Sequence, residues 1–214
     1  MKVFGLPETV RGIVLDMDGT LYSNPAYLKW QESSQVARLA ERLGIALPEA
    51  AGMLGAAREA RSAAGLQATS MANLFRGFGI DMAEIVRWRE EEIRPAEWLI
   101  PDPGLDIALK ELSRHYRLSL LTNNPRKVGV ASLEILGVAA HFSAVVGLDD
   151  TGESKPSVIP FRRVCGELGL DPRQCVSIGD RKDVDIEPAL SIGMGGILVS
   201  GVEEIYGLPE FFRD

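Results

Sequence analysis

The sequence predicts an α/β fold, a Rossmann-like parallel sheet that carries an inserted α-helical cap. Short apolar runs alternate with helical patterns over most of the chain, as in parallel sheets whose strands are joined by crossover helices. One long stretch interrupts this alternation, has no convincing strand and is rich in Ala, Leu, Arg and Glu. We therefore expect an α/β core domain over residues 1–23 and 99–214, and a helical cap domain over residues 24–98 that can move as a lid.

The expected strands of the core are short apolar runs, as in sheets buried on both faces. They lie at residues 12–15, 118–121, 144–146, 175–178 and 196–199. Helical patterns lie between them, at residues 105–114, 126–136, 159–168 and 186–192. Because parallel crossovers are almost always right-handed, a central first strand gives the order 3-2-1-4-5, numbered along the chain. Ligands bind at the switch point of such a sheet, here between the first and fourth strands.

Four helices are expected in the insertion. The first covers residues 25–42, and the second begins at Pro48, a favourable residue for a first turn. The third follows Thr69 or Ser70, and the fourth follows Asp81, which can cap its first turn.

Composition limits the classes of function. The chain has 214 residues, 46% hydrophobic and 25% charged, which is typical of soluble globular proteins. A net charge of −7 argues against nucleic acid and against an anionic membrane as partners, because both attract a basic face. No run approaches the ~20 apolar residues that span a membrane. The two cysteines, Cys165 and Cys175, lack zinc-like spacing and are expected in the core of a cytoplasmic protein. No feature predicts an oligomeric state.

Two acids, Asp16 and Asp18, follow the first expected strand. Residues two apart on an extended chain point the same way, so both carboxylates can face one site. At about 4 Å and an effective dielectric near 20, their repulsion is about 4 kcal/mol, so a cation or a shared proton is needed. The alternative is a solvated turn, but chemistry in open parallel sheets is found at the carboxyl ends of strands.

The ends of three later strands also carry polar residues. Thr122 and Asn123 can donate a hydroxyl and a backbone amide to a phosphate oxygen, or can simply form a turn. Lys155 precedes a proline that begins a helix, where the helix dipole disfavours a positive charge unless a bound anion or a neighbouring carboxylate compensates it. Taken alone, Lys155 would be interpreted as a solvated surface lysine. Asp180 can reach a divalent cation beside the first acids, and Asp185 can support a lysine.

Together the four segments resemble the four motifs of the haloacid-dehalogenase superfamily, in the same order and each at a strand end. They read DxDGT at residues 16–20, Thr122, Lys155, and GDxxxxD at residues 179–185. The resemblance covers residues 11–23 and 101–205. The residues after DGT, Leu-Tyr, are similar to the branch with small helical caps, which includes phosphoglycolate phosphatases and nucleotidases.

The resemblance implies a phosphatase that forms an aspartyl-phosphate. Asp16 would attack phosphorus, and Asp18 would protonate the leaving oxygen and then activate water. Mg²⁺ would be held by Asp16, by the backbone carbonyl of Asp18 and by Asp180. The substrate would be a small phosphorylated metabolite.

The same resemblance assigns residues to the phosphate. Lys155 and Thr122, with the backbone amides of Met17 and Asn123, would stabilise its equatorial oxygens. Asp185 would orient Lys155 without itself contacting the phosphate or the metal.

The side chains of the insertion are expected to shape substrate choice and to supply no group essential to phosphoryl transfer. Its tryptophans are expected to pack the helices (Trp30, Trp88 and Trp98). Its arginines are expected to form a solvated face, from which one could contact the distal end of the substrate (Arg58, Arg61, Arg76, Arg87 and Arg89).

Three alternatives stay open. A phosphomutase of the same superfamily would return the phosphoryl group to a sugar. A receiver-like signalling domain also gathers acids and a lysine around magnesium, but it is shorter and lacks the paired acids. A pseudo-enzyme would act as an interaction module.

Overall fold

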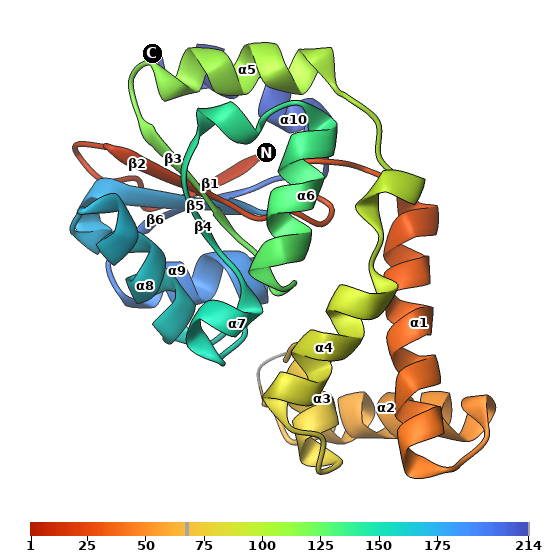
Figure 1. Ribbon diagram of the computed structural model, residues 1–214. Helices are drawn as coiled ribbons and strands as arrows, with labels where there is room; N and C mark the ends of the chain where they lie inside the picture. Colours follow the sequence, from red (N-terminus) through yellow and green to blue (C-terminus); the bar gives the residue numbers. More distant parts are fainter. Residues whose placement is uncertain (67–68, 214) are drawn as a thin grey trace.

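A central β-sheet with helices on both faces forms the larger part of the molecule, and a separate group of helices hangs beside it (Figure 1). The computed structural model describes residues 1–66 and 69–213. The sheet has six strands in the order β1-β6-β5-β2-β3-β4. Its strands are β1 (Lys2–Phe4), β2 (Gly12–Leu15), β3 (Arg117–Leu121), β4 (Phe142–Val146), β5 (Cys175–Gly179) and β6 (Gly195–Leu198).

The five expected strands, β2 to β6, are parallel and lie in the predicted order, with β2 between β3 and β5. The prediction of five strands was nevertheless incomplete, because β1 pairs antiparallel with β6 at the edge of the sheet. This strand has only three residues, and Lys2 and Val3 are exposed. Such a segment shows no burial pattern, and it is a strand only because it pairs with β6.

Helices cover both faces of the sheet. One face packs against α5 (Pro103–Ser113), α6 (Arg126–Leu136), α10 (Val202–Tyr206) and α11 (Leu208–Phe211). The other packs against α8 (Val158–Leu168) and α9 (Glu187–Ser191). Side chains of β2 alternate between the two layers, since Ile13 and Leu15 enter the first core and Val14 enters the second. Shorter elements complete the core: α7 (Leu148–Thr151), 3₁₀ turns Ala139–His141 and Pro172–Gln174, and a π-helix at Lys182–Ile186.

The insertion is helical, as predicted, and no strand occurs in its described parts, residues 24–66 and 69–98. It consists of α1 (Pro25–Leu43), α2 (Leu47–Ala63), α3 (Met71–Gly77), α4 (Met82–Glu92) and the 3₁₀ turn Pro95–Glu97. Side chains of Asn24, Ser70 and Asp81 accept backbone N–H bonds at the starts of α1, α3 and α4. The helices share an apolar cluster, which also includes Leu148 from the core. The division into two domains and the movement of the insertion stay predictions.

The tryptophans pack the insertion, as expected. Trp98 stacks on Tyr27 at a centroid distance of 5.6 Å and on Trp30 at 6.1 Å. Trp88 meets Phe75 edge-on at 6.1 Å. The contacts of Trp98 join the base of the insertion to α1, and the contact of Trp88 joins α4 to α3.

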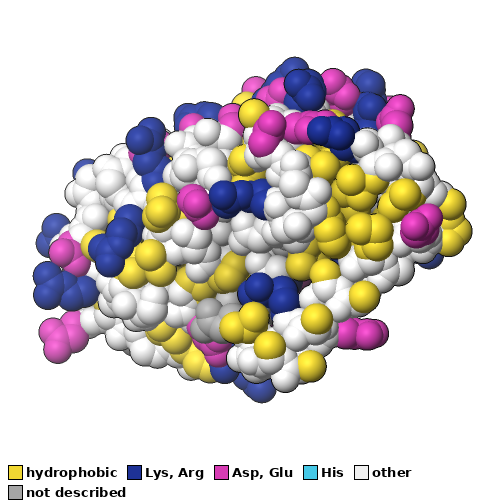
Figure 2. Space-filling model, turned by 90° about the horizontal axis from the view of Figure 1, so that it is seen from below, with side chains coloured by type: hydrophobic (Ala, Val, Ile, Leu, Met, Phe, Trp, Pro, Cys, Tyr) yellow, Lys and Arg dark blue, Asp and Glu magenta, His cyan; other side chains and the backbone are white. Residues whose placement is uncertain are grey.

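The surface seen from below mixes basic, acidic and hydrophobic side chains, and the residues drawn there show no continuous basic face (Figure 2). Among the described residues, no helix is both long enough and apolar enough to cross a membrane.

Candidate active site

Strand register brings the polar residues together at the carboxyl ends of the parallel strands, which form one edge of the sheet. Leu15 on β2 is level with Leu120 on β3 and with Ile178 on β5. The residues that follow these positions, Asp16 and Asp180 among them, therefore leave the sheet side by side. The backbone N–H of Asp16 donates to the carbonyl of Ile178 at 2.9 Å, which joins the two strand ends.

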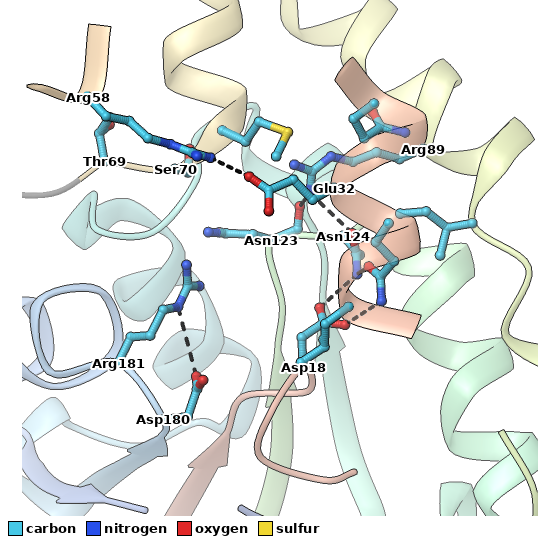
Figure 3. Close-up of a pocket in the computed structure, with 15 residues that line it drawn as sticks. Asp18, Glu32, Arg58, Thr69, Ser70, Arg89, Asn123, Asn124, Asp180 and Arg181 are labelled. Atoms are coloured by element: carbon cyan, nitrogen blue, oxygen red, sulfur yellow. Dashed lines mark hydrogen bonds and ion pairs between the residues drawn. The ribbon is translucent and has the colours of Figure 1, made fainter. Parts of the chain in front are cut away.

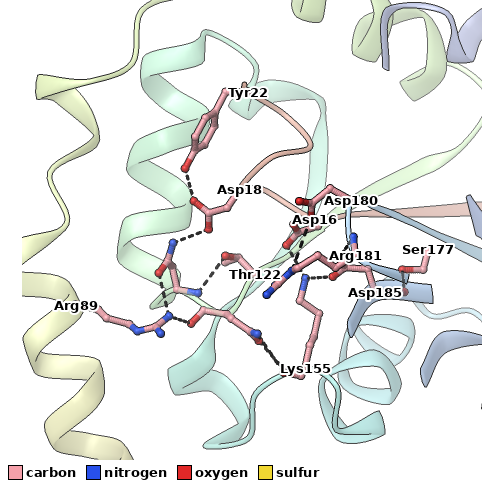
Figure 4. A network of polar contacts seen from close by, with 12 residues as sticks. Asp16, Asp18, Tyr22, Arg89, Thr122, Lys155, Ser177, Asp180, Arg181 and Asp185 are labelled. Carbon is pink, nitrogen blue, oxygen red and sulfur yellow. Dashed lines mark hydrogen bonds and ion pairs between the residues drawn. The ribbon is translucent and has the colours of Figure 1, made fainter. Parts of the chain in front are cut away.

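Lys155 lies at the centre of this edge and is 1% exposed. Its Nζ donates to Asp16 Oδ1 at 2.5 Å and to Asp185 Oδ1 at 2.7 Å (Figure 4). Burial alone would lower the pKa of Lys155, but the two carboxylates outweigh it and raise the pKa above its ordinary value. The lysine is therefore held as a cation between two acids that come from different strands.

Three acids form a possible cation site. One carboxylate oxygen each of Asp16, Asp180 and Asp185 lies within 4.8 Å of the others. Asp16 Oδ2 and Asp180 Oδ1 are buried and have no hydrogen-bond partner in the described part of the chain. Burial, reinforced by Asp185 and opposed by Lys155, raises the pKa of Asp16 to about 7. Buried oxygens in this arrangement suit a hard cation such as Mg²⁺, which would also favour the charged form.

Two glycines allow the acids to approach. Gly19 has φ +80°, and a Cβ built on it would lie 2.6 Å from Asp180 Oδ2. A Cβ on Gly179 would lie 2.5 Å from Cγ of Asp185. A side chain at either position would displace an acid of the site.

Asp18 occupies a different environment from Asp16. Its carboxylate accepts hydrogen bonds from the Tyr22 hydroxyl, from Gln31 Nε2 at 2.8 Å and from Asn124 Nδ2 at 2.8 Å. These partners place it between the core and α1, away from Lys155 (Figure 4). Asp16 therefore lies in the acid cluster beside Lys155, and Asp18 faces the insertion. Two acids in such different environments can serve as a nucleophile and as an acid–base group.

The loop after β3 supports both parts of the site. The Thr122 hydroxyl accepts from the Asn124 N–H at 3.1 Å, so its own hydrogen is directed elsewhere and can be donated. The Asn123 side chain accepts from the Lys155 N–H at 2.8 Å and donates to the Lys155 carbonyl at 3.2 Å. These two bonds hold the backbone of Lys155 against the loop after β3. No pattern in the sequence predicts these two bonds between Asn123 and Lys155.

The prediction that Arg89 belongs to a solvated face was wrong. Its side chain is buried, and Nη1 donates to the Asn123 carbonyl at 2.6 Å and to Asn124 Oδ1 at 3.1 Å. Burial lowers the pKa of Arg89 to about 10, so it remains charged at neutral pH. Because α4 carries several charged residues in succession, its sequence does not reveal which one turns inward.

The role of Gln31 at the site was also missed, although the sequence carries a signal for it. Gln31 lies one turn after the buried Tyr27, on the same face of α1.

A cleft of about 320 Å³ separates the core from the insertion. In Figure 3, Glu32, Arg58 and Arg89 lie on the side of the insertion and Asp18, Asp180 and Arg181 on the side of the core. The residues that line it are mostly polar, and they include Asp18, Asn123 and Asp180 from the core and Gln35, Arg58 and Arg89 from the insertion. Asp16 itself does not line the cleft, but Asp18, two residues further on, and Asp180 of the same acid cluster do.

Comparisons with known proteins agree with this architecture. Residues 10–193 match the family model described as haloacid dehalogenase-like hydrolase. A plasmid phosphoglycolate phosphatase of Cupriavidus necator is 35% identical over 98 residues, which is 45% of this chain and 42% of that protein. The human N-acylneuraminate-9-phosphatase is 36% identical over 86 residues, 40% of this chain and 35% of that protein. The chain thus matches less than half the length of these curated relatives.

Solved structures show the same fold at low identity. A HAD phosphatase from Thermococcus onnurineus has a TM-score of 0.61 and 20% identity, with 95% of this chain and 98% of that chain covered. A predicted phosphoglycolate phosphatase from Haemophilus somnus has a TM-score of 0.56 and 23% identity, with 90% and 87% covered.

Proposed function

The chain belongs to the haloacid dehalogenase-like hydrolases, and we propose that it is a magnesium-dependent phosphatase that acts on a small phosphorylated metabolite. The arrangement of Asp16 carries the proposal. One of its oxygens is held by Lys155, and the other is buried and unpartnered among the described residues. The carboxylate also belongs to the cluster with Asp180 and Asp185. A free carboxylate oxygen beside the Lys155 ammonium group and the proposed Mg²⁺ is suited to attack an anionic phosphate.

The reaction would proceed in two displacements. Asp16 Oδ2 forms a bond to phosphorus while the ester P–O bond breaks, and Asp18 gives its proton to the departing alcohol oxygen. Asp18, now ionised, then removes a proton from water, whose oxygen attacks phosphorus and releases phosphate and free Asp16. The hydrogen bonds from Tyr22, Gln31 and Asn124 hold Asp18 on the side of the leaving group.

The phosphate oxygens would be held by the remaining groups of the edge. Lys155 supplies a buried cation, and Thr122 supplies a hydroxyl hydrogen. The backbone amides of Met17 and Asn123 would complete the set. Asp185 keeps Lys155 in place, since it accepts the second bond of the ammonium group.

Asp16 and Asp180, with the backbone carbonyl of Asp18, would hold Mg²⁺. The ion would neutralise the charge of the carboxylates and of the phosphate. The names of the curated relatives, which are phosphatases, support hydrolysis over the transfer expected of a phosphomutase. Measurable hydrolysis of an aryl phosphate by the purified protein would exclude both a pseudo-enzyme and a receiver-like module.

Turnover of para-nitrophenyl phosphate is expected to require Mg²⁺ and to be lost in excess chelator. Ca²⁺ should substitute poorly, since its looser and higher coordination does not suit an octahedral site. Mg²⁺ should also raise the melting temperature, because it binds the folded state alone. An Asp180→Asn variant should lose this thermal shift and need much more Mg²⁺ for turnover. Full activity in chelator, or an unchanged Mg²⁺ requirement in the variant, would contradict the proposed metal site.

A further inference from the structure

Gln35 is a buried amide whose polar atoms are unused. It lies on α1, is 2% exposed and lines the cleft between the core and the insertion. Neither its amide nitrogen nor its amide oxygen has a hydrogen-bond partner in the described part of the chain. An unpaired buried amide lowers the ratio of folded to unfolded protein by roughly 5- to 150-fold.

Gln31, one turn earlier on α1, provides a direct comparison. Its amide nitrogen donates to Asp18 at 2.8 Å and to the Tyr22 hydroxyl at 2.9 Å, and its oxygen accepts from Asn124 at 3.1 Å. Both glutamines line the same cleft. The first is fully used in holding Asp18, and the second has donor and acceptor capacity that the protein itself does not use.

A second unused donor lies in the same wall. Arg89 is on α4, which packs against α1, and it also lines the cleft. Its Nη1 is engaged with the loop after β3, but its Nε is buried without a partner among the described residues. The wall formed by α1 and α4 therefore contains two unused donors, Gln35 Nε2 and Arg89 Nε, and one unused acceptor, Gln35 Oε1; all three atoms are buried in residues that line the cleft.

We propose that Gln35, with Arg89 beside it, forms the subsite for the leaving alcohol, and that the substrate class is a phosphate ester of a polyol or sugar. This rests on the proposed function. A hydroxyl both donates and accepts, so neighbouring hydroxyls can engage Gln35 Oε1 and the two donors together. An alkyl or aryl group would leave all three atoms unpaired, and a carboxylate would leave Gln35 Oε1 unpaired.

The path through the cleft agrees with this assignment. The leaving oxygen departs at Asp18, which faces the insertion, and the rest of the alcohol extends towards α1 and α4. At the far side, Arg58 pairs with Glu32 at 2.8 Å, and both side chains are about half exposed, so this pair lies at the solvent end. Gln35 lines the same cleft as Asp18 and this pair, and it is buried, so it can select for hydroxyls away from the solvent end.

The first test compares matched esters. We expect the wild type with Mg²⁺ to favour glycerol 3-phosphate over n-propyl phosphate, and a hexitol 6-phosphate over n-hexyl phosphate, by roughly 10- to 100-fold in kcat/KM. Gln35→Met keeps the length and flexibility of the side chain and removes the amide. The ratio should fall towards one in this variant, mainly through the hydroxylated ester.

The second test reads the stability of the ligand-free protein. Gln35→Met removes an unpaired amide, so we expect the melting temperature to rise by a few degrees. Gln31→Met is the matched control, with the same substitution on the same helix, and it should lower the melting temperature because its amide is paired. A purely structural role for Gln35 predicts a fall in both variants.

Three results would overturn the subsite. The first is a Gln35→Met protein that still hydrolyses esters with an unchanged ratio of kcat/KM between the hydroxylated and the alkyl ester. The second is a melting temperature of Gln35→Met below that of the wild type, and the third is a wild-type preference for 3-phosphoglycerate over glycerol 3-phosphate. Absence of turnover by the wild type on every ester, an aryl phosphate included, would instead contradict the proposed function, and the comparison of melting temperatures would still test Gln35.

Discussion

Asp16→Asn is expected to reduce turnover by at least about 10⁴-fold while the chain stays folded. The amide has the volume of the carboxylate but is a poor nucleophile, so no phosphoryl group can be accepted. Lys155 keeps its bond to Asp185, which preserves the centre of the site. The measurement is kcat on an aryl phosphate with saturating Mg²⁺, beside the melting temperature.

Asp183→Asn is the matched control for this substitution. Asp183 lies on the same edge of the molecule in the π-helix, but it is outside the cluster of Asp16, Asp180 and Asp185. It should retain turnover close to that of the wild type. If purified Asp16→Asn were equally active, the covalent route would be wrong.

Lys155→Met is expected to lose most turnover and also to destabilise the protein, by roughly 3–5 kcal/mol in the free energy of unfolding. The side chain is 1% exposed and is bonded to two buried acids. Methionine replaces the stem but not the charge, so Asp16 and Asp185 are left buried without their cation. The effect is measured by urea unfolding in the absence of metal.

Lys182→Met tests whether any lost ion pair would do the same. Lys182 pairs with Glu187 at 2.8 Å, but about half of its side chain is exposed. Such pairs contribute little, and the variant should unfold as the wild type does. Equal stability of Lys155→Met and the wild type would show that the central ion pairs do not hold this edge together.

The sheet was predictable because its strands are buried on both faces. Continuous apolar runs mark β2 to β6, and right-handed crossovers leave few orders in which they can lie. That order alone placed Asp16 beside Asp180, although the two are distant in the chain. β1 escaped prediction because it depends on a neighbour strand and not on its own residues.

The supporting contacts could not be read from the sequence. Arg89 is one of several charged residues on α4, and only the packing of α4 against α1 and the core turns it inward. The same holds for Asn123, whose two bonds to Lys155 join loops that follow different strands. The motifs therefore predicted which polar groups meet at the carboxyl ends of the strands, and the fold was needed to show what holds them; their catalytic roles stay predictions.

Phosphorylation of Asp16 itself tests the central claim most directly. Asp18→Asn should slow attack by water more than transfer to Asp16, so the intermediate should accumulate when this variant is mixed with substrate and Mg²⁺ and quenched in acid. Mass spectrometry of the digested protein is expected to find one added phosphoryl group on the peptide that contains Asp16, and none in the Asp16→Asn, Asp18→Asn double variant. Turnover without any phosphorylated peptide, or a phosphoryl group on a different residue, would contradict the account.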